Sequence, residues 1–286
     1  MHIVLETERL ILRRFTEADV DHLVDLDSDP EVMRYLTGGK PTPRTEIANE
    51  RLPRILRQYQ QGGAGRWAAI ERSTGEFLGW FALDPGEREG EVELGYRLRR
   101  SAWGNGYATE GSRALVRMAF TDLKVDRVFA HTMTVNAASR RVMEKAGLRY
   151  VRTFHLTWDD PIDGTEHGEV EYELRRDHLD EAVRRHCERF NEAQRTGDWA
   201  PFVATFAEDA RMAFTNVPVG PFVGRAAILR AYQENPPTDT MTVHAVEPVD
   251  ADTARARFRW NGGGDGTMLL RFRDDELADL EITFEN

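Results

Sequence analysis

The stretch WGNGYATEG, residues 103–111, places two glycines one residue apart where the chain changes its periodicity. The preceding run EVELGYRLRR (91–100) alternates like a strand, and the following run YATEGSRALVRMAF (107–120) has the period of a helix. A helix N-terminus offers unpaired N–H groups and a positive dipole end, and glycines let an anion approach them closely. The stretch therefore predicts a phosphate-binding turn, with an ordinary tight turn as the structural alternative. The spacing fits neither the dinucleotide-binding fingerprint nor a P-loop.

The length of the chain indicates two domains, since 286 residues exceed the roughly 150 that are typical of one domain. A net charge of −11 argues against a nucleic-acid partner, which needs clustered Lys and Arg. No apolar run is long enough for a signal peptide or a membrane span, so we expect a cytoplasmic protein without a membrane partner. The single cysteine, Cys187, excludes an internal disulfide and a cysteine metal cluster, so we expect no metal and assign Cys187 to helix packing.

Periodicity predicts an alternation of helices and strands that restarts near residues 176–182. In the first part the predicted helices cover about 17–28, 45–61, 107–121 and 136–147, with a turn at 62–65, and the strands cover 9–14, 66–71, 77–84, 91–100, 127–135, 148–158 and 168–176. In the second part the predicted helices cover 177–199, about 199–207 and 224–232, before strands at 241–249, 253–260, 267–273 and 276–284.

Three motifs in the first part, taken in order, resemble the Gcn5-related N-acetyltransferase (GNAT) superfamily, in the subgroup of ribosomal-protein N-terminal acetyltransferases. They are LETERLILRRFTEADVDHL, ELGYRLRRSAWGNGYATEG and VNAASRRVMEKAGLRYV. The resemblance covers about residues 3–176 and implies an α+β fold. In that fold a mixed sheet splays between the strands at 91–100 and 127–135, and acetyl-coenzyme A lies in the gap.

The resemblance also implies which residues hold acetyl-coenzyme A. A backbone N–H near Leu98 would hold the acetyl carbonyl, and Asn136 would bond the pantetheine arm, although a plain N-cap explains Asn136 as well. The family's usual Gln or Arg three residues before the first glycine is Ser101 here, so Arg99 and Arg100 are expected to supply the charge. The pyrophosphate loop maps onto Trp103, Gly104, Asn105, Gly106, Tyr107 and Ala108.

Acetyl transfer to an amine needs a base for the ammonium and an acid for the departing thiolate. We expect Glu93 to be the base, directly or through water; the alternative is that it belongs to a solvated strand with Glu87, Glu89 and Glu91. Glu93 lies an odd number of residues from Leu98, so strict alternation puts their side chains on opposite faces unless a bulge intervenes. The family makes Ser139 the candidate acid, and the alternative is a small helix residue.

Two acidic runs, 16–33 and 157–174, each carry seven carboxylates and no Lys or Arg. Alone each is an ordinary solvated face, but the family architecture places both near the acceptor end of the cleft. Together they predict a cationic acceptor, such as an aminoglycoside-like molecule, a polyamine or a basic peptide N-terminus. His2, His155 and His167 receive no role.

Residues 181–286 resemble the nuclear-transport-factor-two-like superfamily, in its SnoaL-like and ketosteroid-isomerase branch, through RFNEAQRTGDWAPFVATFAEDARM, VGRAAILRAY and LLRFRDDELADLEITF. The resemblance implies a cone with a curved antiparallel sheet around an apolar pocket, and leaves a homodimer open. Phe190, Leu270 and the segment MAFTNVPVG (212–220) lack the groups that isomerase chemistry needs. We therefore expect a ligand-binding or dimerisation domain, with four aromatic residues either lining its pocket or filling its core: Trp199, Phe206, Phe214 and Trp260.

The sequence thus predicts an acetyl-coenzyme A-dependent N-acetyltransferase, with an acetyltransferase domain at 1–176 and a cone domain at 181–286. Its acceptor is expected to be a primary amine on a small molecule or a peptide. The contrasting hypothesis is a non-catalytic sensor in which both cavities bind small molecules.

Overall fold

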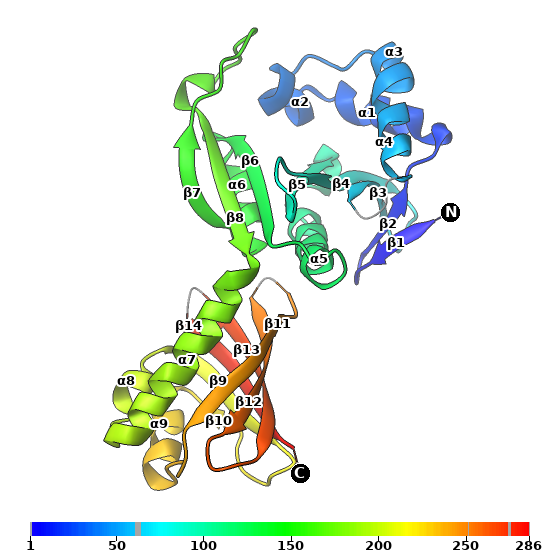
Figure 1. Ribbon diagram of the computed structural model, residues 1–286. Coiled ribbons are helices and arrows are strands. Elements are labelled where there is room, and N and C mark those ends of the chain that lie inside the picture. Colours follow the sequence, from blue (N-terminus) through cyan, green and yellow to red (C-terminus); the bar gives the residue numbers. More distant parts are fainter. Residues whose placement is uncertain (1, 61–63, 251, 274–275, 286) are drawn as a thin grey trace. The chain divides into compact units, whose positions relative to one another are not determined.

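The computed structural model describes residues 2–60, 64–250, 252–273 and 276–285. The chain divides into two compact units, Met1–Arg175 and Arg176–Asn286 (Figure 1). Each unit has its own sheet and its own core, so each is described by itself. Within the described residues, no helix combines the length and the apolar character that a bilayer crossing requires.

The N-terminal unit is built on an eight-stranded mixed sheet of order β1-β2-β3-β4-β5-β6-β8-β7. Most neighbours are antiparallel, and β5 and β6 are the parallel pair of this sheet. The strands are β1 Ile3–Glu6, β2 Leu10–Arg14, β3 Gly65–Glu71, β4 Phe77–Pro85, β5 Glu91–Leu98, β6 Arg127–Met133, β7 Arg149–Phe154 and β8 Glu169–Arg175.

The sheet splays in its middle, between β5 and β6. The two strands pair only from Glu91 opposite Arg127 to Glu93 opposite Phe129, and β5 then continues to Leu98 without this partner. The backbone groups on that edge of β5 therefore face a gap. The predicted fold class, an α+β fold with a splayed mixed sheet, is confirmed.

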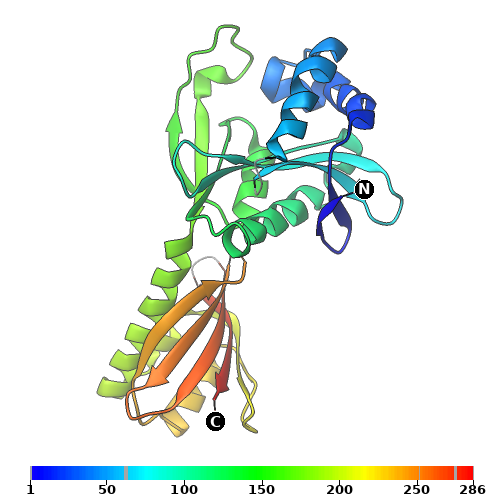
Figure 2. The ribbon, with the colours of Figure 1, turned by 45° about the vertical axis from the view of Figure 1, so that its right-hand side comes forward.

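Helices cover the two faces of this sheet in separate groups (Figures 1 and 2). On one face, α1 (Val20–Ser28) and the helices that follow it enclose a core that includes Leu26, Leu52 and Trp80. On the other face lies α5 (Tyr107–Thr121), which approaches β4 so closely that a Cβ at Gly111 would come within 2.3 Å of the Phe81 ring. Neighbouring residues Trp80 and Phe81 thus serve opposite cores, as the alternation of a strand requires.

Two helices differ from the sequence prediction. A short helix, α2 (Pro30–Thr37), was not predicted; the Asp29 side chain caps it by accepting from the Glu31 N–H, and Pro30 occupies its first turn. The helix predicted at 45–61 is α3 (Arg44–Glu46), a π-helical segment at Ile47–Arg51 and α4 (Leu52–Gln58). Pro53 lacks an N–H and cannot continue the regular α-helical bonding there. The turn predicted at 62–65 falls partly outside the described residues.

In the C-terminal unit, helices α7 (Arg176–Thr196), α8 (Ala200–Val203) and α9 (Arg225–Glu234) lie on one side of a curved sheet (Figures 1 and 2). The sheet order is β10-β9-β14-β13-β12-β11, and β14 pairs β9 in parallel, so the sheet is mixed and not wholly antiparallel as predicted. Its strands are β9 Phe206–Thr215, β10 Phe222–Val223, β11 Met241–Pro248, β12 Thr253–Trp260, β13 Asp265–Arg273 and β14 Glu276–Phe284. The sequence prediction missed β9, because its alternation follows a short helix without a glycine or proline between them.

Candidate active site

The glycine loop closes into the N-terminus of α5, as the sequence predicted. Gly104 and Gly106 have φ angles of 75° and 83°, in the left-handed region that favours glycine. A Cβ built at Gly104 would meet nothing within 4 Å, so space is open beside the loop. The Glu110 N–H bonds the Gly106 carbonyl, which leaves the N–H groups of the preceding turn without an acceptor in the helix. These groups and this space fit a pyrophosphate.

Hydrogen bonds of Arg9 and Trp103 hold this loop in place. The Arg9 guanidinium donates to the Asn105 carbonyl at 2.9 Å and pairs with Glu110 of α5. The Trp103 indole N–H donates to the Leu98 carbonyl at 2.9 Å, which ties the loop to the end of β5. The loop is therefore shaped before any ligand arrives, which reduces the entropy cost of binding.

The two arginines expected to supply phosphate charge lie in different surroundings. Arg99 turns toward α1, where its guanidinium bonds Asp25 at 2.8 Å and lies 4.0 Å from Glu76. Arg100 is exposed, and none of the described residues forms an ion pair with it. Arg100 is thus the arginine whose charge is available to an anion, while the charge of Arg99 is already compensated.

Leu98 presents its backbone to the gap between β5 and β6. The N–H of Arg99 donates to the Leu78 carbonyl of β4 at 2.7 Å, so alternation directs the N–H of Leu98 to the opposite edge of β5. The ladder of β5 with β4 is regular from Val92 to Leu98, and the bulge considered from the sequence is not present there. No bulge is needed, because a backbone N–H lies in the plane of the sheet and is reached from either face.

Glu93 faces a histidine that the sequence analysis did not single out. The Glu93 Oε1 atom lies 3.3 Å from Nδ1 of His131 on β6, two residues beyond the last paired position of the two strands. Both side chains reach solvent, with exposed fractions of 43% and 32%. The hydrogen bond to Glu93 raises the pKa of His131, against an opposing effect of burial. Glu93 therefore has a histidine partner at the gap, unlike a carboxylate on a freely solvated strand.

Two more carboxylates lie on the same face as His131. Glu171 stands opposite His131 in the antiparallel ladder and accepts hydrogen bonds from Arg127 and Arg152. Glu169, two residues away, is 6% exposed, and its Oε1 has no hydrogen-bond partner among the described residues. Burial raises the pKa of Glu169, because the charged form is poorly solvated there. An ammonium group entering this face would supply the missing partner.

On the opposite face, Ser139 meets a tyrosine of β5. The Ser139 hydroxyl lies 2.8 Å from the Tyr96 hydroxyl, which also donates to the Ser139 carbonyl at 3.0 Å. Burial raises the pKa of Tyr96 to about 12. The side chain of Asn136 caps α6 (Ala137–Lys145) by accepting from the Ser139 N–H and donates to Thr132. Asn136 therefore has the structural role considered from the sequence, and Ser139 belongs to a hydroxyl pair whose tyrosine the sequence analysis missed.

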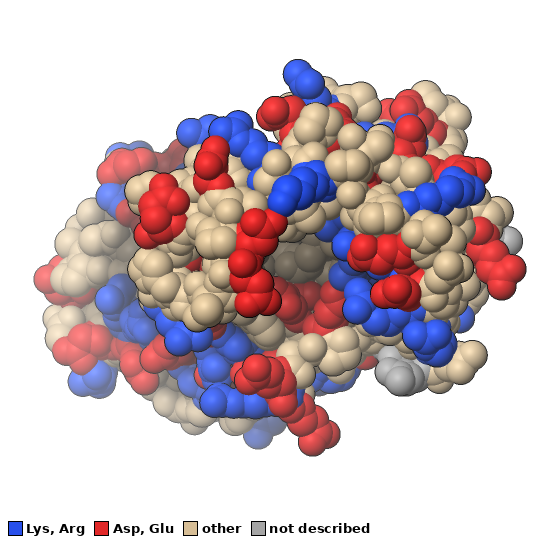
Figure 3. Space-filling view, turned by 90° about the horizontal axis from the view of Figure 1, so that it is seen from above, with Lys and Arg blue, Asp and Glu red and all other residues tan. Residues whose placement is uncertain are grey.

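The two acidic runs are less free than their sequence suggests. Seven of their carboxylates pair with basic residues from other elements, in the pairs Arg127–Glu171, Arg127–Glu173, Arg13–Asp19, Arg44–Asp21, Arg99–Asp25, Arg97–Asp27 and Lys40–Asp160. The last pair joins the loop after α2 to the loop between β7 and β8, so the second run lies close to the loop that follows α2. The face seen in Figure 3 is hollowed, with acidic side chains in and around the hollow and basic ones beside them.

Known proteins resemble parts of this chain in sequence and in fold. Residues 9–149 match the family model of an acetyltransferase (GNAT) domain, and residues 183–280 match that of a SnoaL-like domain. FsC-acetyl coenzyme A-N(2)-transacetylase of Aspergillus fumigatus is 36% identical over 181 residues, which are 60% of this chain and 76% of the relative. The chain belongs to the GNAT family of N-acetyltransferases. This GNAT protein is also 35% identical to the uncharacterized protein YkkB of Bacillus subtilis, over 55% of this chain and 91% of the relative.

Solved structures share the GNAT fold of the N-terminal unit. A probable acetyltransferase superimposes with a TM-score of 0.55 and 21% identity, covering 62% of this chain and 99% of its own. RimL, a ribosomal L7/L12 alpha-N-protein acetyltransferase in complex with coenzyme A, superimposes with a TM-score of 0.53 and 18% identity, covering 61% of this chain and 98% of its own. At these identities the likeness establishes the fold.

Proposed function

We propose that this GNAT protein transfers an acetyl group from acetyl-coenzyme A to a primary amine on a cationic acceptor. The observation that carries the proposal is the gap that opens beyond Glu93, where β5 continues without β6 and ends at the glycine loop. Residues 1–176 would form the acetyltransferase domain and 181–286 the SnoaL-like domain, which agrees with the change of unit at Arg176. The printed name of the Aspergillus relative, which includes acetyl coenzyme A and N(2), supports the donor and the nitrogen acceptor.

The chain's own groups would hold the donor along the open edge of β5. Acetyl-coenzyme A supplies an activated thioester when bound. The N–H of Leu98 would bond the acetyl carbonyl and stabilise the negative charge that develops on its oxygen. Asn136 would offer its amide to the pantetheine arm. The pyrophosphate would lie against Trp103, Gly104, Asn105, Gly106, Tyr107 and Ala108, with Arg100 rather than Arg99 supplying a free positive charge.

Residues on the two faces of the sheet would move the protons. Glu93, on the face of α1, would take a proton from the acceptor ammonium, directly or through water, and His131 would orient the carboxylate. The neutral nitrogen would then bond the acetyl carbon, the carbon–sulfur bond would break, and the nitrogen's second proton would pass to solvent water. Ser139, on the face of α5, would return a proton to the thiolate, with Tyr96 replacing it through their hydrogen bond.

The acceptor is proposed to be cationic because two carboxylates on the face that an amine would enter have no Lys or Arg partner among the described residues. The unsatisfied oxygen of Glu169 and the solvent-facing carboxylate of Glu93 lie on the face that an amine would enter. Aminoglycoside-like molecules, polyamines and basic peptide N-termini all carry such an amine. Most carboxylates of the two acidic runs are already paired, so the recognition would rest on these two residues more than on the total charge.

The proposal is tested by measuring the release of free thiol from acetyl-coenzyme A. The full-length protein is assayed with a panel of aminoglycosides, polyamines and basic peptides. We expect amine-dependent release that falls in the Glu93→Gln variant. Binding of acetyl-coenzyme A without thiol release by any amine would favour the non-catalytic sensor and contradict the proposal. Binding alone does not separate the two functions, because either protein is stabilised by its ligand.

A further inference from the structure

Trp103 is a large aromatic residue of the glycine loop that does not fill a core. It is 47% exposed, although an aromatic ring contributes most to stability when it is buried. The contact that fixes its ring is the indole N–H, which donates to the Leu98 carbonyl at 2.9 Å. The role of Trp103 therefore has to be sought at Leu98, the residue whose N–H would bond the acetyl carbonyl.

The carbonyl and the N–H of Leu98 lie on the same edge of β5. In a strand the two groups of one residue point the same way, and the N–H of Arg99 points the other way, to the Leu78 carbonyl of β4. Both groups of Leu98 thus face the gap, because the pairing of β5 with β6 ends at Glu93. A backbone carbonyl needs a hydrogen-bond partner, and the indole of Trp103 supplies the partner that β6 does not.

An indole N–H is suited to this position because it donates a hydrogen bond and cannot accept one. It bonds the carbonyl of Leu98 and does not compete with a ligand for the N–H of the same residue. Once bonded, the carbonyl has a fixed direction, and its oxygen repels a neighbouring acetyl oxygen less. The N–H beside it is then held in place before the donor binds, which is what stabilisation of a developing negative charge requires.

Further hydrogen bonds connect Trp103 to the part of the loop that would hold the pyrophosphate. The Asn105 side chain donates to the Trp103 carbonyl at 3.2 Å, and the Asn105 carbonyl accepts from Arg9 at 2.9 Å. The backbone N–H of Trp103 donates to the Arg100 carbonyl at 3.1 Å. Trp103 thus links the end of β5 with the pyrophosphate loop through both its side chain and its backbone.

We propose that Trp103 is a positioning residue that directs the N–H of Leu98 toward the acetyl carbonyl and couples it to the pyrophosphate loop. The inference rests on the acetyl-coenzyme A site of the proposed function, and it goes further by assigning a role in acetyl transfer to the indole N–H itself. Trp103 acts through Leu98 and does not touch the reacting atoms. Loss of its N–H therefore affects the acetyl carbonyl more than the affinity for acetyl-coenzyme A.

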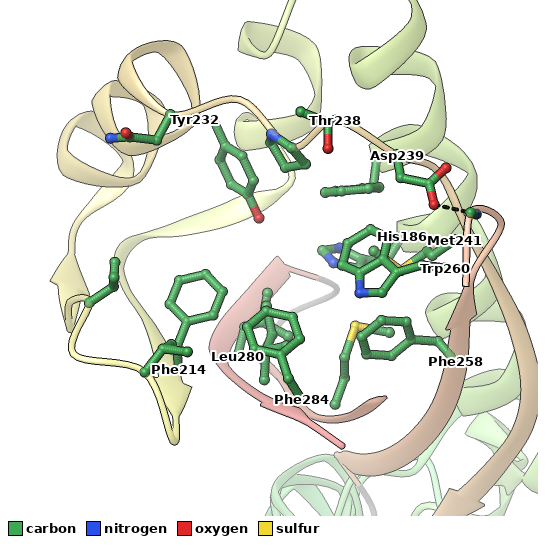
Figure 4. A pocket seen from close by; sticks show the side chains of 18 of the residues that line it. His186, Phe214, Tyr232, Thr238, Asp239, Met241, Phe258, Trp260, Leu280 and Phe284 are labelled. Atoms are coloured by element: carbon green, nitrogen blue, oxygen red, sulfur yellow. Dashed lines mark hydrogen bonds between the residues drawn. The ribbon is translucent and has the colours of Figure 1, made fainter. Parts of the chain in front are cut away.

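The C-terminal unit provides a matched control. Trp260 and Phe214 line a cavity of about 840 Å³ in that unit (Figure 4), whereas Trp199 and Phe206, the other aromatic residues expected there from the sequence, are buried in its core. Trp260 thus belongs to a different unit from the glycine loop. The Trp260→Phe variant removes an indole N–H and leaves the loop unaltered.

The infrared band of the thioester carbonyl reports the hydrogen bond directly. The full-length protein is saturated with acetyl-coenzyme A that carries ¹³C at the acetyl carbonyl, without an amine, and the band is obtained as the difference from the unlabelled donor. In the unaltered protein and in Trp260→Phe we expect the band at a lower wavenumber than in buffer, because a fixed N–H polarises the carbonyl. In Trp103→Phe this shift should shrink, and kcat should fall about tenfold while the Kd for acetyl-coenzyme A changes less than about threefold.

A second replacement separates the N–H from the shape of the ring. In 3-benzothienylalanine, sulfur takes the place of the indole N–H, so this residue in place of Trp103 fills the same space and should fold even where Trp103→Phe does not. The same decrease of the band shift and the same loss of kcat are expected. An unchanged band, or weaker binding with an unchanged kcat, would overturn the proposal.

These outcomes differ from those that test acetyl transfer itself. If the unaltered protein does not bind acetyl-coenzyme A, or binds it without a shift of the carbonyl band, the role of the Leu98 N–H fails and the inference fails with it. If the shift depends on Trp103 but no amine of the panel releases thiol, the proposed transfer fails and the positioning of the carbonyl by Trp103 is supported.

Discussion

Replacing Gly104 with alanine separates the folding role of the glycine loop from its binding role. Gly104 has a φ of 75°, and a Cβ there would meet no atom of the protein within 4 Å. The cost to folding is therefore the left-handed backbone alone, about 1 to 2 kcal/mol. In a unit of this size 1 kcal/mol lowers the melting temperature by roughly 3 °C. The proposed ligand, by contrast, would lose the open space in which a phosphate oxygen reaches the backbone N–H groups.

The expected loss of affinity for acetyl-coenzyme A follows from the hydrogen bonds that the Gly104→Ala variant would lose. A hydrogen bond to a charged group contributes about 1.5 to 3 kcal/mol, so losing one raises the Kd for acetyl-coenzyme A by roughly 10- to 150-fold. Gly197→Ala is a matched control, because Gly197 has a φ of 76°, also with nothing within 4 Å of its Cβ, and lies in the C-terminal unit. Thermal unfolding measures the strain in each variant, and calorimetric titration with acetyl-coenzyme A measures the affinity. An affinity in Gly104→Ala equal to that in Gly197→Ala would refute the pyrophosphate assignment.

Four further outcomes test the proposed chemistry. Glu93→Gln should lower kcat by about 10²- to 10⁴-fold with acetyl-coenzyme A affinity retained, and a normal rate in steady-state assays would remove its role as base. In the same variant the pKa of His131, followed by NMR titration, should fall because its hydrogen bond to a charged carboxylate is lost; an unchanged value would show that the pair does not form. Ser139→Ala and Tyr96→Phe should each slow thiol release. If the two hydroxyls act together, the double variant should be no slower than the slower of the two single variants. Additive losses of rate would contradict a joint role of the two hydroxyls. Glu169→Gln should raise the KM for a cationic amine about tenfold without changing the KM for acetyl-coenzyme A. Rising salt should raise the KM for the amine in the unaltered protein more than in this variant.

The His131–Glu93 pair also predicts a dependence of stability on pH. The pKa of His131 is raised in the folded state, so the protonated imidazole stabilises the fold. This contribution is fully present below the ordinary histidine pKa of about 6.5 and is lost as the pH rises through the higher folded value. Both side chains are partly exposed, so the contribution is small. Denaturant unfolding of the unaltered protein and of His131→Gln across this range measures it.

Local sequence signals predicted the parts of the site that are continuous in the chain. The glycine loop, the helix that follows it and the cap at Asn136 each depend on residues within a few positions of one another, so their geometry was readable before the fold. The sequence analysis missed His131 and Tyr96. Each lies in an ordinary strand pattern, and its role depends on a partner that is distant in the chain. That partner is 38 residues away for Glu93 and His131 and 43 residues away for Tyr96 and Ser139.

The sequence by itself determined the two-part organisation, the strand-loop-helix unit and the identity of the family. Periodicity, glycine positions and capping depend on residues that are close together in the chain, so they can be read without knowing any tertiary contact. Only the tertiary structure decided which charges are free. The fold compensates Arg99 with Asp25 and leaves Arg100 exposed, although the two are neighbours in the chain. It likewise leaves an oxygen of Glu169 without a hydrogen-bond partner among the described residues and buries His186 beside the rings of Phe202 and Phe206. The solvation and pairing of a side chain depend on the residues that surround it in the folded structure, and the order of residues along the chain does not show which residues these are.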